Sequence, residues 1–112
     1  MINITIIKSN NKIMTIEATG HSGYAESGKD IVCSAVSTLT QALINGLIEV
    51  VKITPKYVID EEIPHLSVSL PKDIDGEKFK QAQVLMSSTY LALKQVADSY
   101  KKFIKIKEKQ ND

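Results

Sequence analysis

The chain opens with two short alternating segments, INITIIK at residues 2–8 and KIMTIEAT at residues 12–19. In the first segment, Ile2, Ile4 and Ile6 alternate with Asn3 and Thr5. This period of two is typical of a strand with one buried face. The polar turn at residues 9–11, SNN, separates the segments, so they predict a β-hairpin. In the second strand we expect two faces, one with Met14, Ile16 and Ala18 and the other with Ile13, Thr15 and Glu17.

A loop and a long helix follow the hairpin. Residues 20–29, GHSGYAESGK, contain three Gly and two Ser, a composition that predicts a flexible loop. Asp30 opens a helix whose apolar residues recur at steps of three and four, with Val50 as the last residue of that face. Pro55 ends this helical segment.

The second half of the chain repeats this alternation of strands and helix. Residues 56–62 and 65–70 predict a second pair of strands, joined by Ile63-Pro64. Asp73 or Asp75 caps a second helix that runs to about Lys101, residues 102–107 form a final strand, and the tail 109–112 is frayed. The order ββαββαβ predicts an α/β fold, a two-layer sandwich in which two helices cover one face of a mixed or antiparallel sheet. We expect residues 1–112 to form a single domain.

The composition excludes several classes of protein. Hydrophobic residues make up 43% and charged residues 24% of the 112 residues, which is ordinary for a globular domain. The net charge is +1 and all 14 basic residues are Lys, so direct binding to nucleic acid is not expected. One Cys forms no internal disulfide, no signal peptide pattern is present, and no apolar run approaches the roughly 18 residues of a membrane span. We therefore expect a cytoplasmic protein without a membrane partner.

The side chains most suited to chemistry lie in residues 20–37. With Asp30 as N-cap, Cys33 lies in the first helical turn, where free N–H groups and the helix dipole favour a thiolate. His21, at the far end of the loop, can take the thiol proton and return it to a leaving amine. The loop contains three glycines, Gly20, Gly23 and Gly28, which let its backbone approach a substrate closely.

Two roles are open to Asp30. As an N-cap its carboxylate accepts from the N–H of Val32 or Cys33, which is the commoner role. As a third catalytic member it orients His21. The roles conflict, because a capped N–H of Cys33 cannot also hold an oxyanion. A carboxylate this close also disfavours the thiolate.

Ser34 and Ser37 lie on the same helix as Cys33. Ser37 follows Cys33 by one turn, so its hydroxyl can bond the thiolate, the substrate or the carbonyl of Cys33. His65 begins a strand and is interpreted as an exposed strand-end residue rather than a second base. Two His and one Cys without ligand-like spacing predict no zinc site, and no phosphate-binding glycine motif is present, so we predict neither metal nor cofactor.

The block from Gly20-His21 through DIVCSAVS at residues 30–37 resembles the ribosomal processing cysteine proteases, called Prp or YsxB-like proteins. Length and element order extend the resemblance over nearly the whole chain. It implies a cytoplasmic α/β homodimer that removes a short N-terminal extension from a large-subunit ribosomal protein precursor, without metal or cofactor. It also implies that His21 and Cys33 form the dyad and that Asp30 and Ser37 belong to the site. Tyr24 either stacks on an aromatic substrate residue or is an ordinary loop residue, and we favour the second.

Two functions follow. The first is peptide-bond hydrolysis, with the oxyanion held by N–H groups at the helix start, such as those of Cys33 or Ser34. The second is a non-enzymatic ribosome-associated binding domain, favoured by the Lys-rich segment 101–109 and the lack of a clear partner to orient His21. The first requires a ribosomal protein precursor as partner and no direct contact with nucleic acid.

Overall fold

The computed structural model describes residues 1–26, 30–62 and 64–111. Its elements follow the predicted order. The strands are β1 (Ile2–Ser9), β2 (Lys12–Thr19), β3 (Lys56–Asp60), β4 (His65–Ser69) and β5 (Ile104–Gln110). The helices are α1 (Ile31–Asn45), its π-helical continuation η1 (Gly46–Val51), and α2 (Gly76–Ser99).

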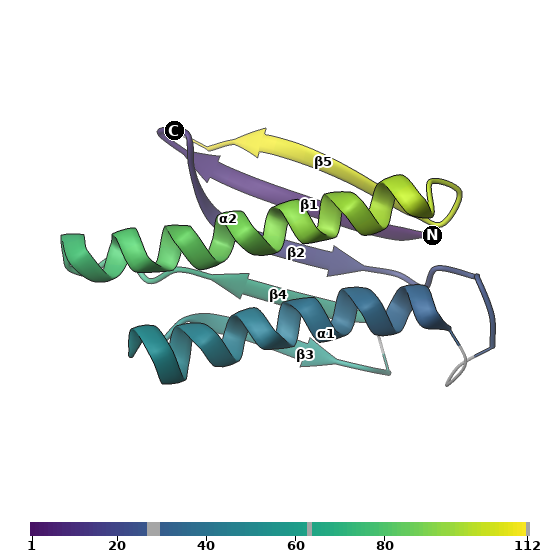
Figure 1. The fold of residues 1–112 in the computed structure, drawn as a ribbon, viewed down its shortest axis with the longest axis horizontal. Coiled ribbons are helices and arrows are strands. Elements are labelled where there is room, and N and C mark those ends of the chain that lie inside the picture. The colour runs from purple at the N-terminus through teal and green to yellow at the C-terminus, as the bar shows by residue number, and fades with distance from the viewer. Residues whose placement is uncertain (27–29, 63, 112) are drawn as a thin grey trace.

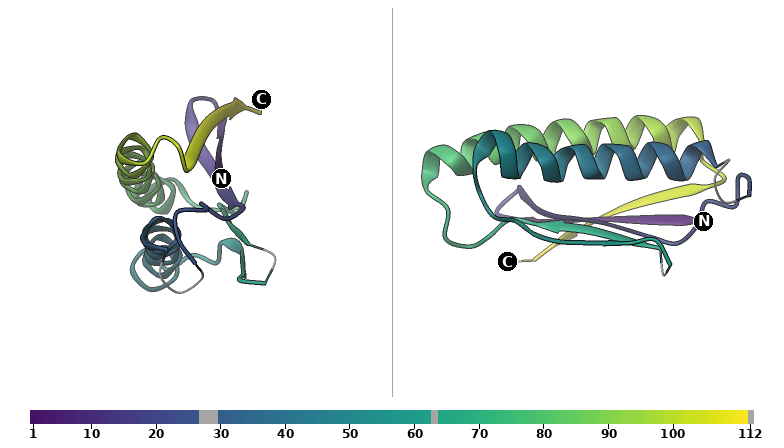
Figure 2. Two further views of the ribbon diagram at one scale, coloured as in Figure 1. Left: turned by 90° about the vertical axis from the view of Figure 1, so that its right-hand side faces the viewer. Right: turned by 90° about the horizontal axis from the view of Figure 1, so that it is seen from below.

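The five strands form one mixed sheet in the order β3-β4-β2-β1-β5. All neighbours are antiparallel except β1 and β5, which run parallel. The two long helices lie side by side on one face of the sheet (Figure 1), and the edge-on view shows two layers (Figure 2). The predicted two-layer α/β sandwich is therefore confirmed, with the mixed sheet as the arrangement adopted.

The core lies between the helices and the sheet. The alternation of β1 sends Ile2, Ile4 and Ile6 toward the helices, and all three are buried. Across the sheet, Ile6 pairs with Ile16 and Ile16 with Val68, which makes a continuous buried row. Each such aliphatic side chain contributes about 1.5–3 kcal/mol by leaving water. The helices complete the core with Val32, Val36, Leu43, Ala82, Met86 and Leu93.

A β-bulge changes the face of one hairpin residue. The register of β1 against β2 shifts between Ile7 and Lys8, which leaves Met14 as the extra residue. Ile13 thereby turns to the helix side and is only 4% exposed. The prediction that Ile13 shares a face with Thr15 and Glu17, opposite Ile16, is wrong for this reason. The side chain of Gln83 on α2 bonds the backbone of Ile13 at the bulge, donating to its carbonyl at 2.7 Å and accepting from its N–H at 3.0 Å.

The end of the first helix also departs from its predicted periodicity. In η1 the hydrogen bonds span five residues instead of four, so each turn holds more residues. As a result Val51, at 4% exposure, faces the core, and Val50, at 74%, faces solvent. The prediction that Val50 lies on the buried face is therefore wrong. Lys52 then ends the segment in the left-handed conformation, with φ of 67°.

The chain after α2 is more ordered than predicted. β5 begins two residues later than expected and continues to Gln110, so the expectation of a frayed tail from Lys109 is wrong through residue 111. The N–H of Asn111 donates to the carbonyl of Lys8 at 2.8 Å. The ammonium of Lys8 also bonds Glu108 at 2.5 Å, which raises the pKa of Lys8 and lowers that of Glu108.

By length and composition the segment Ile31–Val51 is long and apolar enough to cross a membrane, with a mean hydropathy of 1.6 in its most apolar window. The segment is not a continuous apolar run, because polar residues such as Ser37, Gln41 and Asn45 interrupt it. A core helix passes the same test, and here Val36, Leu43 and Leu47 are buried in the core.

Candidate active site

The start of α1 is closed by Asp30. Its Oδ1 accepts from the N–H groups of Val32 and Cys33, both at 3.0 Å, and its carbonyl accepts from the N–H of Ser34 at 3.0 Å. The capping role predicted for Asp30 is thus the one the structure displays. The N–H groups of Cys33 and Ser34, expected to hold an oxyanion, are both engaged by Asp30.

Ser22 is a site residue that the sequence reasoning missed. Its side chain is 4% exposed, and its hydroxyl donates to Oδ2 of Asp30. The Ser22 hydroxyl oxygen also accepts from the N–H of Tyr24 at 3.0 Å, and the N–H of Ser22 donates to Sγ of Cys33 at 3.4 Å. A hydroxyl residue directly after His21 was the available signal, but only the folded loop shows that it meets the cap.

Competing effects act on the Asp30 carboxyl. Its burial opposes ionisation, but hydrogen bonds outweigh that effect and lower the pKa of Asp30 below its ordinary value. The largest of these contributions comes from the Ser22 hydroxyl, followed by the N–H of Cys33. Among the described residues, His21 is not a partner of this carboxylate.

Glycine is required where the loop leaves β2. Gly20 has a φ of +91°, and a Cβ there would lie 2.5 Å from the carbonyl oxygen of Met1. The N–H of Gly20 also donates to the carbonyl of Pro64 at 3.1 Å, which fixes the loop against the β3–β4 connection. Gly23 has a φ of +75° in open space. Gly28 lies outside the described residues.

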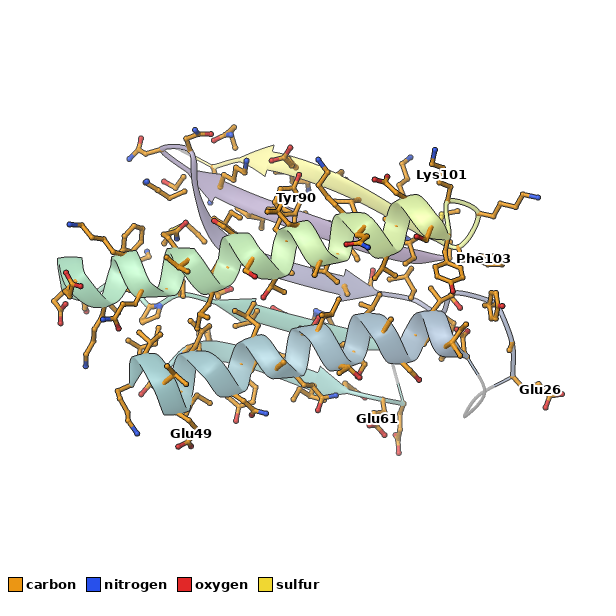
Figure 3. The ribbon with its side chains drawn as sticks, in the orientation of Figure 1. Glu26, Glu49, Glu61, Tyr90, Lys101 and Phe103 are labelled. Atoms are coloured by element: carbon orange, nitrogen blue, oxygen red, sulfur yellow. The ribbon has the colours of Figure 1, made fainter. Side chains whose placement is uncertain are left out.

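A cavity of about 580 Å³ joins the loop, the start of α1 and the turn between β3 and β4. Figure 3 labels Glu26 and Glu61, which mark the loop and that turn on either side of the helix start. The predicted site residues that line the cavity are Gly20, His21, Gly23, Asp30, Cys33, Ser34 and Ser37. His21 is exposed and Cys33 is half-buried, so a substrate can reach the thiol and the imidazole from one space.

Tyr24 packs away from this cavity. Its ring meets Tyr100 edge-on at 5.7 Å and Phe103 at 5.3 Å between centroids. Figure 3 labels Phe103 just after the end of α2, beside the loop. This packing favours the interpretation of Tyr24 as a loop residue over a stacking platform for substrate.

Ser37 lies one turn beyond Cys33 on the wall of the cavity. Its oxygen accepts from the Nε2 of Gln41 at 2.7 Å. Its bond to the Cys33 carbonyl, one of the predicted alternatives, is not among the contacts of the described residues. His65 also lines the cavity, where its Nε2 lies 2.9 Å from Glu17, so it is a partnered strand-end residue.

No group of three or more His, Cys, Asp or Glu with the geometry of a metal site occurs in the part of the chain that the structure describes.

The sequence and the fold both match known proteins. A family model described as cysteine protease Prp matches residues 1–105. The ribosomal processing cysteine protease Prp of Bacillus subtilis (strain 168) is 30% identical over 107 residues, or 95% of this chain and 96% of that protein. A crystal structure from Streptococcus mutans matches with a TM-score of 0.85 at 30% identity, covering 99% of this chain and 96% of the other.

A crystal structure of the S. aureus ribosomal processing protease Prp with a covalently linked product peptide matches with a TM-score of 0.85. It is 23% identical and covers 97% of this chain and all of the other, so it supports the fold alone. Together the matches define the class of protein, a cysteine protease. The chain belongs to the family of the ribosomal processing cysteine protease Prp. Membership of a peptidase family decides against the non-enzymatic binding domain.

Proposed function

We propose that this protein removes the N-terminal extension of a large-subunit ribosomal protein precursor, with Cys33 as nucleophile and His21 as acid and base. The observation that carries the proposal is the shared cavity, which a thiol and an imidazole line from opposite ends of one loop. The Bacillus subtilis relative, named for ribosomal processing, supports the choice of substrate.

The reaction begins when Sγ of Cys33 forms a bond to the scissile carbonyl carbon and the thiol proton passes to His21. The carbon–nitrogen bond breaks as His21 returns that proton to the leaving amine. Water, deprotonated by His21, then attacks the thioester carbonyl, releasing the new carboxylate and restoring the thiol. We assign the hydroxyl of Ser37 as a donor to the substrate oxygen, which is supported by its place on the cavity wall and by the bond from Gln41, since that bond occupies only a lone pair of the Ser37 oxygen.

The remaining residues support this reaction. Asp30 holds the helix start, and Ser34 contributes to the cavity wall. Gly20, Gly23, Tyr24 and Gly28 form the loop that we propose covers the substrate strand. No metal or cofactor takes part in these steps.

The test is cleavage of the ribosomal protein precursor, followed by mass spectrometry, with the wild type, Cys33→Ala and His21→Ala. We expect both variants to lose activity by about a hundredfold or more. Lys56→Ala is the control, since Lys56 is exposed on the edge strand β3 outside the cavity, and it should keep the wild-type activity. Full activity in either dyad variant would end the proposal.

We further propose that residues 1–112 act as one domain and that the protein is a cytoplasmic homodimer. The family model, which spans residues 1–105, supports the first part. The resemblance of the block at residues 20–37 to the family supports the second. Light scattering on the purified protein measures the dimer directly, and a monomer mass at working concentration would refute it.

A further inference from the structure

We infer that Ser22 is a positioning residue that holds the His21 loop on the helix start and keeps the Asp30 charge from suppressing the Cys33 thiolate. The inference rests on the proposed function, because it concerns the reactivity of the same thiol. Ser22 precedes Asp30 by eight residues, and it is buried beside His21 in the chain.

Three hydrogen bonds of Ser22 converge on this corner. Its hydroxyl donates to Oδ2 of Asp30 and accepts from the N–H of Tyr24, and its N–H donates to Sγ of Cys33. A single residue therefore ties the loop to the cap and offers the sulfur a donor. The N–H of Ser22 belongs to the residue that directly follows His21. Its bond to the sulfur therefore also restrains the position of the His21 side chain.

The bond from the Ser22 hydroxyl to Oδ2 bears on the conflict that a capping carboxylate close to Cys33 disfavours the thiolate. Oδ1 of Asp30 is occupied by the N–H groups of Val32 and Cys33, and Oδ2 by the Ser22 hydroxyl. Cys33 contacts this carboxylate through its own N–H, so the negative charge lies close to the sulfur. Without the Ser22 hydroxyl, Oδ2 loses its donor, and the less compensated charge disfavours a second negative charge on the thiol. A looser loop also withdraws the Ser22 N–H from the sulfur.

Both consequences act in one direction, against the thiolate. The other titratable groups that line the cavity are His21, His65, Asp60 and Glu61. His65, Asp60 and Glu61 lie outside the loop and stay in place when Ser22 is changed. His21 belongs to the loop that Ser22 holds, so the effect of the substitution reports on the Ser22 contacts together with the imidazole that they position.

The experiment is the rate of Cys33 alkylation by iodoacetamide on the full chain, measured between about pH 5 and about pH 9. In Ser22→Ala we expect the midpoint of the profile to rise by about half to one pH unit, the equivalent of one hydrogen bond. Thr40→Val is the matched control. Like Ser22→Ala it removes a buried hydroxyl, but this one lies on α1 and donates to the Val36 carbonyl. Its profile coincides with that of the wild type.

A second variant separates the electrostatic role from packing. Asp30→Asn removes the charge, so Ser22→Ala in that background should shift the midpoint by at most half as much. An unchanged profile in Ser22→Ala, or a full shift in the Asp30→Asn background, would overturn the inference. Alkylation requires no peptide cleavage, so these outcomes are independent of whether His21→Ala abolishes processing.

Discussion

Asp30 contributes to the stability of the fold through the same bonds that shape the site. Its carboxylate caps α1 through two N–H groups, and it is buried. Loss of an N-cap carboxylate costs about 1–2 kcal/mol, so Asp30→Ala should lower the free energy of unfolding by that amount. Urea denaturation measures the change. Asp75→Ala, which removes the exposed cap of α2, is the control and should cost less.

The pH dependence of this contribution has a definite sign. The pKa of Asp30 is lowered in the folded protein from an ordinary value of 3.8, so its ionisation stabilises the fold above that pH. The stabilisation is lost as the pH falls through the lowered folded-state value. We expect the wild type to lose more free energy of unfolding than Asp30→Asn when acidified below about pH 4. Parallel acid curves for the two proteins would contradict this expectation.

Replacing glycine in the loop has two costs, one from the positive φ and one from the space that a Cβ needs, and Gly20 and Gly23 allow the two to be measured separately. Both have positive φ, but only Gly20 lies where a Cβ would meet backbone, at 2.5 Å from the Met1 carbonyl oxygen. Gly23→Ala should therefore cost about 1–2 kcal/mol of unfolding free energy from its backbone conformation alone. Gly20→Ala should cost about 1–3 kcal/mol more, because β1 must also shift. Equal denaturation midpoints for the two variants would refute this difference.

Residue types and spacing were sufficient to predict Asp30 as the cap and to single out His21 and Cys33. They could not predict Ser22, because its contact with Asp30 depends on how the loop between them folds back. The capping bond to Asp30 from the N–H of Val32 or Cys33 was predicted, and the structure contains both. A sequence shows which groups can bond, whereas the backbone path decides which of them do.

At the scale of elements, the periodic parts of the chain were predictable and the irregular parts were not. The strand β2 has the predicted bounds, and α2 starts after Asp75, one of the two predicted caps. The bulge at Met14 and the π-helical turns of η1 each displace the pattern by one residue. Neither has a signature in hydrophobic periodicity, so Ile13 and Val50 were assigned to the wrong faces.

The end of η1 offers a prediction at this scale. Lys52 adopts the left-handed conformation, with φ of 67° and ψ of 44°, which costs a residue with a side chain about 1 kcal/mol. The side chain is exposed and the carbonyl keeps its bond from the Lys78 ammonium in any variant. Lys52→Gly should therefore raise the free energy of unfolding by about 1 kcal/mol, measured in urea. Lys52→Ala keeps the steric cost, and a gain of the same size there would contradict the explanation.

At the scale of the whole molecule, the site depends on both ends of the chain. The loop that carries His21 follows the N-terminal hairpin, and Tyr24 in that loop packs on Tyr100 and Phe103 at the end of α2. The carbonyl of Phe103 also accepts from the N–H of Ile2 at 2.8 Å, at the start of β1. Helix start, loop and C-terminal junction therefore form one corner of the molecule (Figure 1).

This corner predicts an effect of Tyr24 on activity without any contact with substrate. Each edge-on ring contact contributes about 0.5–1.5 kcal/mol, so Tyr24→Ala releases the loop from α2. Holding the imidazole near the thiol then costs conformational entropy, and kcat/KM for precursor cleavage should fall by about threefold to tenfold. Tyr24→Phe keeps the ring and should retain the wild-type rate.

The matched control for this prediction is Tyr57→Ala, since Tyr57 on the edge strand β3 is 49% exposed against 43% for Tyr24. It removes a similar ring outside the cavity and should leave kcat/KM unchanged. If Tyr24 instead contacts the substrate directly, Tyr24→Ala raises KM in proportion to the size of the aromatic residue in the peptide. A loss that is the same for peptides with and without aromatic residues indicates anchoring of the loop, because anchoring acts on His21 whatever the substrate.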